Sequence, residues 1–402
     1  MKKFVRFMSA ALSSALVLTA LAGCGGSNDG GSSSGKIKIG SIGPITGGAA
    51  IYGQAVKNAA EIAVEEINAK GEDIQFELKF EDDENDAEKS VNAYNKLKDW
   101  GMQILMGTVT TKPCIAVSTE TSEDKIFQLT PSASSTDVIG GQPDENGNVT
   151  IQRKDNVFQM CFTDPNQGVA SAQYIKEQNL GTKIAVIYNN GDAYSTGIYQ
   201  KFESEAKKEG LEIVSVTTFP DDTNSDFSAQ LNDAKAKGAD LLFLPIYYTP
   251  ASLILTQASK MNYTPKFFGV DGMDGILTVK NFDTKLAENV MFLTPFTADA
   301  ADEKTQNFVK KYKEKFGDTP NQFAADTYDC IYALYEACKA KGVKASDKVA
   351  DICEALTAQF TDSSFKFDGL TGTGMTWKTT GEVSKSPEGM VIKNGAYEGM
   401  DK

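Results

Sequence analysis

The side chains that could do chemistry in this chain of 402 residues are carboxylates, hydroxyls and thiols, because the sequence contains 54 acidic residues and no histidine. Histidine is the commonest general base, the usual zinc ligand and the partner of most serine and cysteine nucleophiles. Adjacent carboxylates such as Asp82 and Asp83 lie in a charged loop, where they indicate solvation rather than acid–base catalysis. We therefore predict a binding protein and not an enzyme, with no cofactor and no metal site.

Hydroxyl and glycine residues gather in three segments, each at the end of a predicted strand. These segments are residues 43–54 (GPITGGAAIYGQ), 107–113 (GTVTTKP) and 129–138 (LTPSASSTDV). A glycine-rich turn lets backbone N–H groups at a helix start approach a bound carboxylate, and a hydroxyl can replace part of its hydration. No Lys-Ser/Thr pair closes the first segment, so it is not a phosphate-binding loop. Each segment also has a simpler interpretation as a strand–helix turn, a helix cap or a loop.

The second half of the chain adds two segments with tyrosines and one with an acid between glycines. These are residues 188–197 (YNNGDAYSTG), 246–251 (IYYTPA) and 268–275 (FGVDGMDG). Aromatic walls suit a small ligand, because they give a large contact area and have little rotamer freedom to lose. Taken singly, however, the tyrosines are more simply core or rim residues, and the acid is more simply a turn residue.

The elements that would position these segments alternate short β-rich runs with amphipathic helical stretches from Lys36 onwards. We predict strands at residues 37–42, 76–80, 103–106, 126–129, 183–188, 211–216, 240–244 and 290–294. We predict helices at residues 49–69, 87–100, from 113, at 166–177, 194–209 and 227–236, and around residues 310, 332 and 352. This alternation is typical of parallel sheets covered by helices on both faces, and the length suits two lobes.

The N-terminus has the pattern of an export signal. Basic residues precede an apolar stretch over residues 8–22, which is shorter than the ~20 residues that span a bilayer, and Leu-Ala-Gly then leads to Cys24. This spacing resembles the bacterial lipobox, so we expect residues 1–23 to be removed and Cys24 to carry a lipid at the outer face of the cell membrane. Plain cleavage near Ala22, leaving a free thiol, is the alternative. Residues 24–35 would form a flexible tether.

Charge and cysteine spacing exclude other classes of site. The net charge is −14 and no segment concentrates lysine or arginine with aromatics, which disfavours a nucleic-acid surface. The cysteines at 114, 161, 330, 338 and 353 lack the spacing of a zinc site. Cys330 and Cys338 lie about 12 Å apart along one predicted helix and cannot bond to each other. Cys338 and Cys353 could form a disulfide, or all five could be small buried residues.

Together these segments resemble the family of branched-chain amino acid ABC-transporter binding proteins, which are bilobed periplasmic binding proteins of type I. The resemblance covers nearly all of residues 36–402 and implies an α/β fold of two doubly wound, Rossmann-like lobes joined by three hinge crossings. The crossings are expected near residues 158–163, 291–296 and 368–375. Lobe 1 would then comprise residues 36–160 and 295–370, and lobe 2 residues 161–294 and 371–402.

The family's ligand-binding positions correspond to seven residues here: Tyr52, Thr111, Ser132, Ser134, Tyr194, Tyr247 and Asp271. By resemblance, Thr111 contacts the α-carboxylate of the ligand, the Ser132 carbonyl faces its ammonium, and Asp271 pairs with that ammonium. Ser134 replaces a threonine of the family, and Asp271 replaces its usual, longer glutamate. Tyr194 would lie over the ligand.

The resemblance implies the extracytoplasmic solute-binding component of an ABC importer. Its ligand would be an α-amino acid, aliphatic or branched-chain, which the lipid-anchored monomer delivers to permease and ATPase subunits. Alternatives are the same fold with another small solute, such as an amide or an aromatic acid, and a ligand-sensing subunit for a membrane receptor. Residues 323–337 also resemble the family, but their apolar spacing indicates helix packing, so we place them outside the site.

Overall fold

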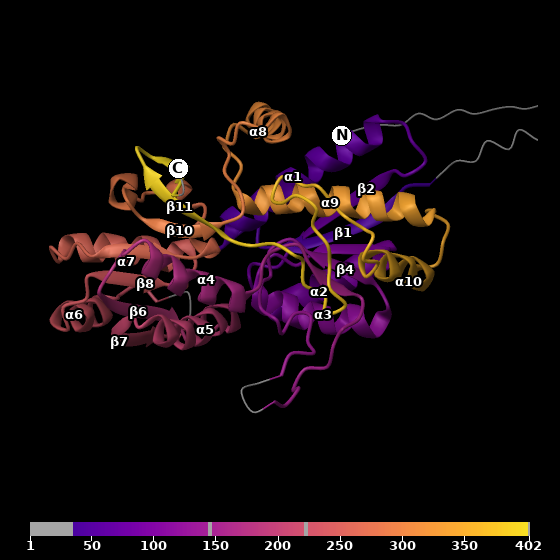
Figure 1. The fold of residues 1–402 in the computed structure, drawn as a ribbon. Coiled ribbons are helices and arrows are strands. Elements are labelled where there is room, and N and C mark those ends of the chain that lie inside the picture. Colours follow the sequence, from indigo (N-terminus) through magenta and orange to yellow (C-terminus); the bar gives the residue numbers. More distant parts are fainter. Residues whose placement is uncertain (1–34, 144–146, 221–223, 401–402) are drawn as a thin grey trace, which may run out of the picture. The chain divides into compact units, whose positions relative to one another are not determined.

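Two β-sheets organise the protein, and each is flanked by helices (Figure 1). The computed structural model describes residues 35–143, 147–220 and 224–400, and the predicted signal segment and Cys24 lie outside them. Within these ranges, no helix combines the length and the apolar character needed to cross a bilayer.

The first sheet is parallel throughout and has the strand order β2-β1-β3-β4-β5. Its strands are β1 (Ile37–Gly43), β2 (Phe76–Asp82), β3 (Ile104–Gly107), β4 (Phe127–Thr130) and β5 (Val157–Gln159). Every residue of β3 and β4 is buried, because helices cover both faces of a parallel sheet. We call the part of the molecule built on this sheet lobe 1.

The second sheet has the order β12-β11-β10-β9-β8-β6-β7 and forms lobe 2. Its strands are β6 (Lys183–Asn189), β7 (Glu212–Phe219), β8 (Leu241–Leu244), β9 (Lys266–Gly269), β10 (Met291–Thr294), β11 (Glu388–Lys393) and β12 (Ala396–Gly399). The pairs from β7 to β10 are parallel, whereas β11 is antiparallel to both of its neighbours. The predicted class, two doubly wound α/β lobes, is confirmed.

The helices are α1 (Ala50–Ala69), α2 (Ala87–Trp100), α3 (Thr111–Asp124), α4 (Asp164–Glu177), α5 (Ala193–Glu209), α6 (Ser228–Ala236), α7 (Tyr248–Lys260), α8 (Glu303–Phe316), α9 (Gln322–Lys341) and α10 (Val349–Phe360). In lobe 1, α1 and α9 pack together on one face of the sheet and α2 and α3 on the other (Figure 1). In lobe 2, α4 and α5 pack together, as do α6 and α7.

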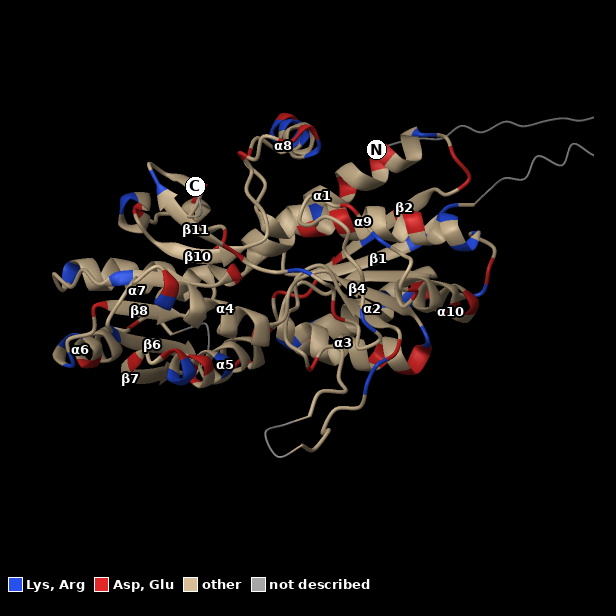
Figure 2. Ribbon diagram, viewed as in Figure 1, with Lys and Arg blue, Asp and Glu red and all other residues tan. Residues whose placement is uncertain are grey.

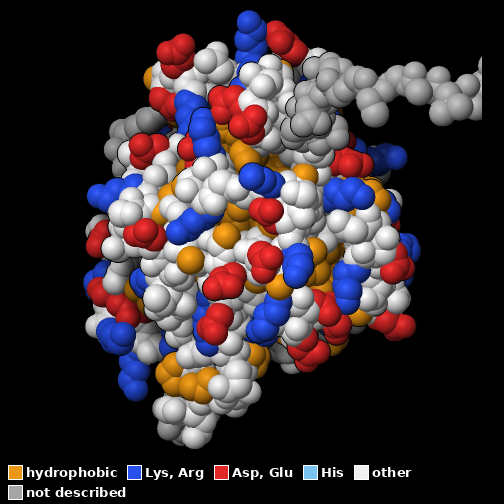
Figure 3. Space-filling view, turned by 90° about the vertical axis from the view of Figure 1, so that its right-hand side faces the viewer, with side chains coloured by type: hydrophobic (Ala, Val, Ile, Leu, Met, Phe, Trp, Pro, Cys, Tyr) orange, Lys and Arg blue, Asp and Glu red, His pale blue; other side chains and the backbone are white. Residues whose placement is uncertain are grey.

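Local sequence signals set several of these boundaries. The Asp86 carboxylate caps α2 by accepting the Lys89 N–H at 2.9 Å, and α2 ends at Gly101, whose φ of 87° suits a residue without a side chain. Charged residues lie mainly on the outer helices and loops (Figure 2). On the face drawn in Figure 3, acidic and basic side chains are interspersed, as solubility requires.

The passage from α10 to β11 runs along lobe 1 before it reaches lobe 2. The Trp377 ring packs on Phe360 of α10, with ring centroids 4.6 Å apart, and its indole N–H donates to the Gln159 carbonyl of β5 at 2.8 Å. The third crossing was expected near residues 368–375. In the structure the chain pairs with the sheet of lobe 2 only later, from Glu388.

The five cysteines after Cys24 are free and buried, so the structure contains no bond between Cys338 and Cys353. Burial raises the pKa of the Cys338 thiol to about 12 and that of the Cys353 thiol to about 11. The sequence left open a disulfide between Cys338 and Cys353 or five small buried cysteines. The structure shows the second arrangement.

Candidate functional site

The predicted site residues meet where the carboxyl ends of strands in both sheets face each other. Ligand sites of open α/β sheets lie at this edge, because helix N-termini and loops gather there. Tyr52 follows β1, Thr111 follows β3 and Ser132 follows β4, while Tyr194 follows β6. Ser134 also follows β4, and Tyr247 and Asp271 follow β8 and β9, so all seven come after a strand of one sheet or the other.

A small chamber between the lobes, the inner chamber, is lined by ten residues: Tyr52, Val109, Thr110, Thr111, Ser132, Tyr194, Tyr247, Asp271, Gly272 and Phe323. Six of the seven predicted ligand-binding residues are among them. The volume of the chamber is about 10 Å³, close to the smallest that holds one water molecule. A ligand larger than water can therefore occupy it only if its walls move apart.

The wall from lobe 1 presents hydroxyls at the N-terminus of α3. Thr110 is the residue before the helix, yet its side chain does not cap α3, and no described residue accepts or donates a hydrogen bond at its buried hydroxyl. The Ser132 hydroxyl donates to the Val109 carbonyl at 2.6 Å, which fixes the neighbouring loop. The helix start carries partial positive charge, so this wall suits an anionic group.

Aromatic rings from both lobes make the other walls. The centroid of the Tyr52 ring lies 4.3 Å from that of Phe323 and 5.4 Å from that of Tyr247. The Tyr247 ring is tilted against Tyr194 at a centroid separation of 5.0 Å. Phe323 belongs to the segment that the sequence placed outside the site. The apolar spacing of that segment is typical of a helix that packs in the core. Only the position of Phe323 in the first turn of α9 could have indicated that it reaches the chamber.

Asp271 supplies the carboxylate of the inner chamber. It is 4% exposed, and its Oδ1 accepts a hydrogen bond from the Tyr194 hydroxyl at 2.6 Å. The Gly272 N–H donates to the same hydroxyl at 2.9 Å. Burial raises the pKa of Asp271 to about 7. Across the described ranges, no lysine or arginine forms an ion pair with Asp271, so the acid has a neutral partner and no cationic one.

Ser134, the seventh predicted residue, does not line the inner chamber. It is fully buried, and its carbonyl accepts the Asp164 N–H at 3.0 Å at the start of α4. Burial raises the pKa of Asp164 well above its ordinary value, and the nearby Ser134 hydroxyl opposes that rise. The structure thus places Ser134 at the junction with lobe 2, behind the chamber.

Hydrogen bonds between the lobes close the inner chamber. The Tyr52 hydroxyl donates to the Gly272 carbonyl, and the Ile51 N–H donates to the Tyr248 hydroxyl at 3.1 Å. The Thr249 hydroxyl donates to the Gly48 carbonyl at 2.7 Å. These contacts define a closed arrangement of the two lobes.

Gln322, at the first position of α9, joins the turn that carries Asp271. Its side-chain amide donates to the Asp271 carbonyl at 2.8 Å, and its N–H donates to Oδ2 of Asp274 at 2.8 Å. Asp274 is buried, and burial raises its pKa to about 6. The N-terminus of a lobe 1 helix is thereby bonded to the lobe 2 turn that positions the acid.

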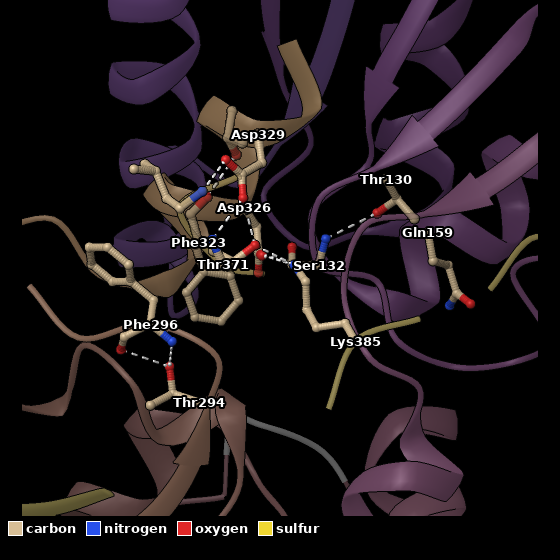
Figure 4. Close-up of polar contacts among 12 residues, drawn as sticks. Thr130, Ser132, Gln159, Thr294, Phe296, Phe323, Asp326, Asp329, Thr371 and Lys385 are labelled. Carbon is tan, nitrogen blue, oxygen red and sulfur yellow. Dashed lines mark hydrogen bonds and ion pairs between the residues drawn. The ribbon is translucent and has the colours of Figure 1, made fainter. Parts of the chain in front are cut away.

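A buried ion pair lies beside Phe323, where the chain passes from lobe 1 to β11 (Figure 4). The Lys385 ammonium contacts Asp326 of α9 at 2.6 Å, and the two side chains are 1% and 3% exposed. Lys385 also donates to the Thr371 hydroxyl at 2.5 Å, and that hydroxyl donates to Asp329 at 2.6 Å. Asp329 accepts two further backbone N–H groups, so this cluster is internally satisfied.

Comparison with known proteins assigns the chain's family. Residues 36–393 match the family model described as periplasmic binding protein. The chain is 32% identical to Leu/Ile/Val-binding protein homolog 3 of Brucella melitensis over 242 residues, 59% of this chain and 61% of that protein. It is 30% identical to Leu/Ile/Val-binding protein BraC3 of Rhizobium johnstonii, over 59% of this chain and 62% of that one. The matches thus span about three-fifths of these two relatives.

Solved structures extend the similarity over most of the chain. The leucine-binding protein LivK of Thermotoga maritima matches with a TM-score of 0.78 and 25% identity, covering 90% of this chain and 97% of that one. The branched-chain amino acid transporter substrate-binding protein LivJ of Streptococcus pneumoniae, in complex with isoleucine, gives 0.79 and 26%, covering 90% and 98%. A Rhodopseudomonas palustris solute-binding protein in complex with benzoate gives 0.77 at 18% identity, covering 91% and 96%, which shows the shared fold alone.

Proposed function

The chain belongs to the periplasmic binding protein family, and on that premise we propose that it binds an α-amino acid in the inner chamber. The observation that carries the proposal is the state of Asp271. Among the described residues, this buried carboxylate has a tyrosine as its partner and no cation, which is costly, and an ammonium group would compensate it. An α-amino acid brings such a group.

The opposite wall supports the same class of ligand. The N-terminus of α3, with Thr110 and Thr111, offers hydroxyls and N–H groups to an anion, and lies in lobe 1. Asp271 lies in lobe 2. A ligand with one positive and one negative group would therefore bridge the lobes, whereas a simple anion would leave Asp271 uncompensated.

Four aromatic rings and Val109 complete the walls, so the group between the two charged ends should be apolar and small. The relatives named above are Leu/Ile/Val-binding proteins, and the S. pneumoniae protein was solved with isoleucine. Both facts support an aliphatic, branched-chain ligand. The benzoate-bound neighbour supports the fold alone, and an aromatic acid would lack the amine that Asp271 calls for.

Binding would couple to closure, because neither lobe alone supplies both charged ends of the site. We infer that the lobes separate to admit the ligand, since the closed chamber of about 10 Å³ is too small for an amino acid. A ligand that contacts both lobes favours the closed form by its differential affinity for that form. The closed protein would then be the form that a transporter recognises.

Family membership indicates an extracytoplasmic location and a role as the solute-binding component of a transporter rather than as an enzyme. We propose delivery of the ligand to the permease and ATPase subunits of an ABC importer by a monomer tethered through lipidated Cys24. A ligand-sensing role for a membrane receptor would use the same closed form. Mass spectrometry of the protein recovered from membranes would test the lipid.

The test of the ligand is a thermal-shift screen of the purified protein against all proteinogenic amino acids, simple amides, aromatic acids and polyols, followed by calorimetry on each hit. A true ligand at a hundredfold excess over its Kd should add about 2.7 kcal/mol to the free energy of unfolding. Shifts confined to aliphatic L-amino acids would support the proposal. Shifts confined to compounds without an amine would reject the amino-acid ligand.

A further inference from the structure

A second, larger chamber also lies between the lobes. This outer chamber has a volume of about 400 Å³ and is lined by residues of both lobes: Gly48, Ala49, Glu84, Asn85, Asp86, Lys89, Lys112, Asn189, Gly191, Asp192, Pro220, Tyr247, Thr249 and Pro250. Its walls differ in chemistry from those of the inner chamber. Three carboxylates and two ammonium groups face it, whereas the inner chamber has aromatic rings, hydroxyls and a single acid.

Tyr247 is the one described residue that lines both chambers. It stands at the start of α7, where its carbonyl accepts the Ala251 N–H at 3.2 Å, and it is 8% exposed. The rings of Tyr52 and Tyr194 contact it from two sides, at centroid separations of 5.4 Å and 5.0 Å. Tyr247 therefore lies between a chamber walled by aromatic rings, hydroxyls and one acid and a chamber with several charged groups.

The ring of Tyr247 has little room to move inwards. Gly272 packs against it so closely that a Cβ added there would lie 3.0 Å from Cδ1 of Tyr247 and 2.5 Å from the Tyr194 hydroxyl. The hydrogen bond from Thr249 to Gly48 holds the start of α7 to lobe 1 two residues further on. Gly272 thus limits movement of the ring on one side, and the hydrogen bond holds the start of α7 to lobe 1.

We propose that the ring of Tyr247 determines specificity by limiting how long the ligand's side chain can be. This inference rests on the proposed function. It adds a limit on the length of the ligand's side chain, which the proposed function does not specify. A short apolar side chain ends against the ring, whereas a long one must displace it and carry its end group into the outer chamber. Without the ring, the two chambers would be continuous, and a side chain could reach the carboxylates of the outer one.

The charge of the outer chamber predicts which long side chains gain most. The carboxylates of Glu84, Asp86 and Asp192 outnumber the ammonium groups of Lys89 and Lys112. Lys89 is also already paired with Glu84 at 2.6 Å. A cationic end group, as in lysine or arginine, is therefore favoured over a neutral or anionic one.

The experiment measures Kd by calorimetry for leucine, methionine, glutamine, lysine and arginine in the wild type and in Tyr247→Ala, Tyr247→Leu and Tyr247→Phe. The quantity compared is the ratio of the lysine Kd to the leucine Kd. We expect Tyr247→Ala to lower this ratio at least tenfold and Tyr247→Leu to lower it by less. Tyr247→Phe retains the ring and should retain the ratio, whatever happens to the absolute affinities.

An unchanged ratio in a Tyr247→Ala protein that still binds leucine would overturn the proposal, as would an equal fall in Tyr247→Phe, because the ring would then not be the barrier. If Tyr247→Ala fails to fold, Tyr247→Leu decides by the same ratio. A wild type that binds benzoate and no amino acid would reject the proposed ligand and leave the partition testable with benzoate against 4-(aminomethyl)benzoate. A wild type that binds neither series overturns both inferences.

Discussion

Two neighbouring regions of the molecule each contain buried carboxylates that the protein treats in opposite ways. Asp326, on α9, contacts the Lys385 ammonium at 2.6 Å, and its neighbour Asp329 accepts three hydrogen bonds from Leu370 and Thr371. Asp271, in the inner chamber, has the Tyr194 hydroxyl and no ion pair among the described residues. Burial raises the pKa of Asp326 to about 6 and that of Asp271 to about 7.

The difference separates scaffold from site. A buried charge is tolerated when it is paired and hydrogen-bonded, and it is costly when it is not. A lysine compensates the acid at the passage to β11 (Figure 4). Among the described residues, no lysine or arginine does so for Asp271 in the chamber. A buried acid left without a cation is what a site for an ammonium ligand requires.

The largest expected effect comes from removing the cation of the scaffold pair. Lys385→Met should lower the free energy of unfolding by about 3–5 kcal/mol, because it leaves Asp326 buried without compensation. Urea unfolding at pH 7 measures the loss. The matched control is Lys310→Met, whose partner Glu314 lies 3.9 Å away with both side chains mostly exposed, and which should change stability by less than about 1 kcal/mol. Equal effects of the two variants would remove the contrast between the regions.

Removing the buried charge in the chamber should raise stability, whereas removing Lys385 should lower it. Asp271→Asn should weaken binding of the amino-acid ligand at least tenfold, since the ammonium loses its ionic partner. It should also raise the stability of the ligand-free protein above pH 7 by about 1 kcal/mol, because it removes an uncompensated charge. Calorimetry and urea unfolding measure the two quantities. A variant that binds normally would reject the role of Asp271.

The raised pKa of Asp271 predicts opposite pH dependences for stability and for affinity. Its folded pKa of about 7 exceeds the unfolded value of about 3.9, so the ligand-free protein holds the proton more tightly and loses this stability as the pH rises from about 4 to about 7. Ligand affinity should rise over the same range, by up to about tenfold per pH unit, because the ammonium pairs with the ionised form.

Asp83, Asp274 and Asp326 also have raised pKa values, so the wild type alone does not isolate Asp271. The measurement is therefore the difference between the wild type and Asp271→Asn at each pH. We expect that difference to flatten above about pH 7. A pH dependence of affinity that survives in Asp271→Asn would assign it to another group.

The smallest expected effects concern two buried threonines. Like the two acids, they differ in whether the side chain has a partner in the protein. The Thr130 hydroxyl donates to the Thr108 carbonyl at 2.6 Å and accepts the Ala133 N–H at 3.0 Å, whereas the buried Thr110 hydroxyl has no partner among the described residues. Thr130→Val should cost about 1–2 kcal/mol of stability. Thr110→Val should leave stability nearly unchanged and weaken ligand binding several-fold. A stability loss in Thr110→Val as large as that in Thr130→Val would contradict this division.

Much of the fold could be predicted because its signals are local. Helix ends at Gly101 and Gly210, and strands that are apolar throughout, follow from the conformations and burial of single residues. The site residues that directly follow strands were predictable for the same reason. A parallel sheet brings the carboxyl ends of its strands to one edge, so sequence position fixes location.

Residues that reach the site through tertiary packing were not predictable in this way. Phe323 arrives at the chamber on α9, far along the chain from Tyr52, and its spacing is that of a core residue. The passage after α10 follows lobe 1 as far as Val383 because Trp377 packs on Phe360. No local sequence pattern predicts that contact. Whether Cys338 and Cys353 bond was equally outside the reach of spacing alone.

The hydrogen bonds that join the lobes, from Tyr52 to Gly272 and from Thr249 to Gly48, also have a kinetic meaning. With these bonds holding the lobes around a bound solute, its release would require the lobes to separate. The rate constant of that opening is therefore a ceiling on the dissociation rate of every ligand, tight or weak. The residence time of a ligand would then depend on the opening rate of the lobes as well as on the ligand's own contacts. A partner that separates the lobes could release ligands of different affinity at a common rate.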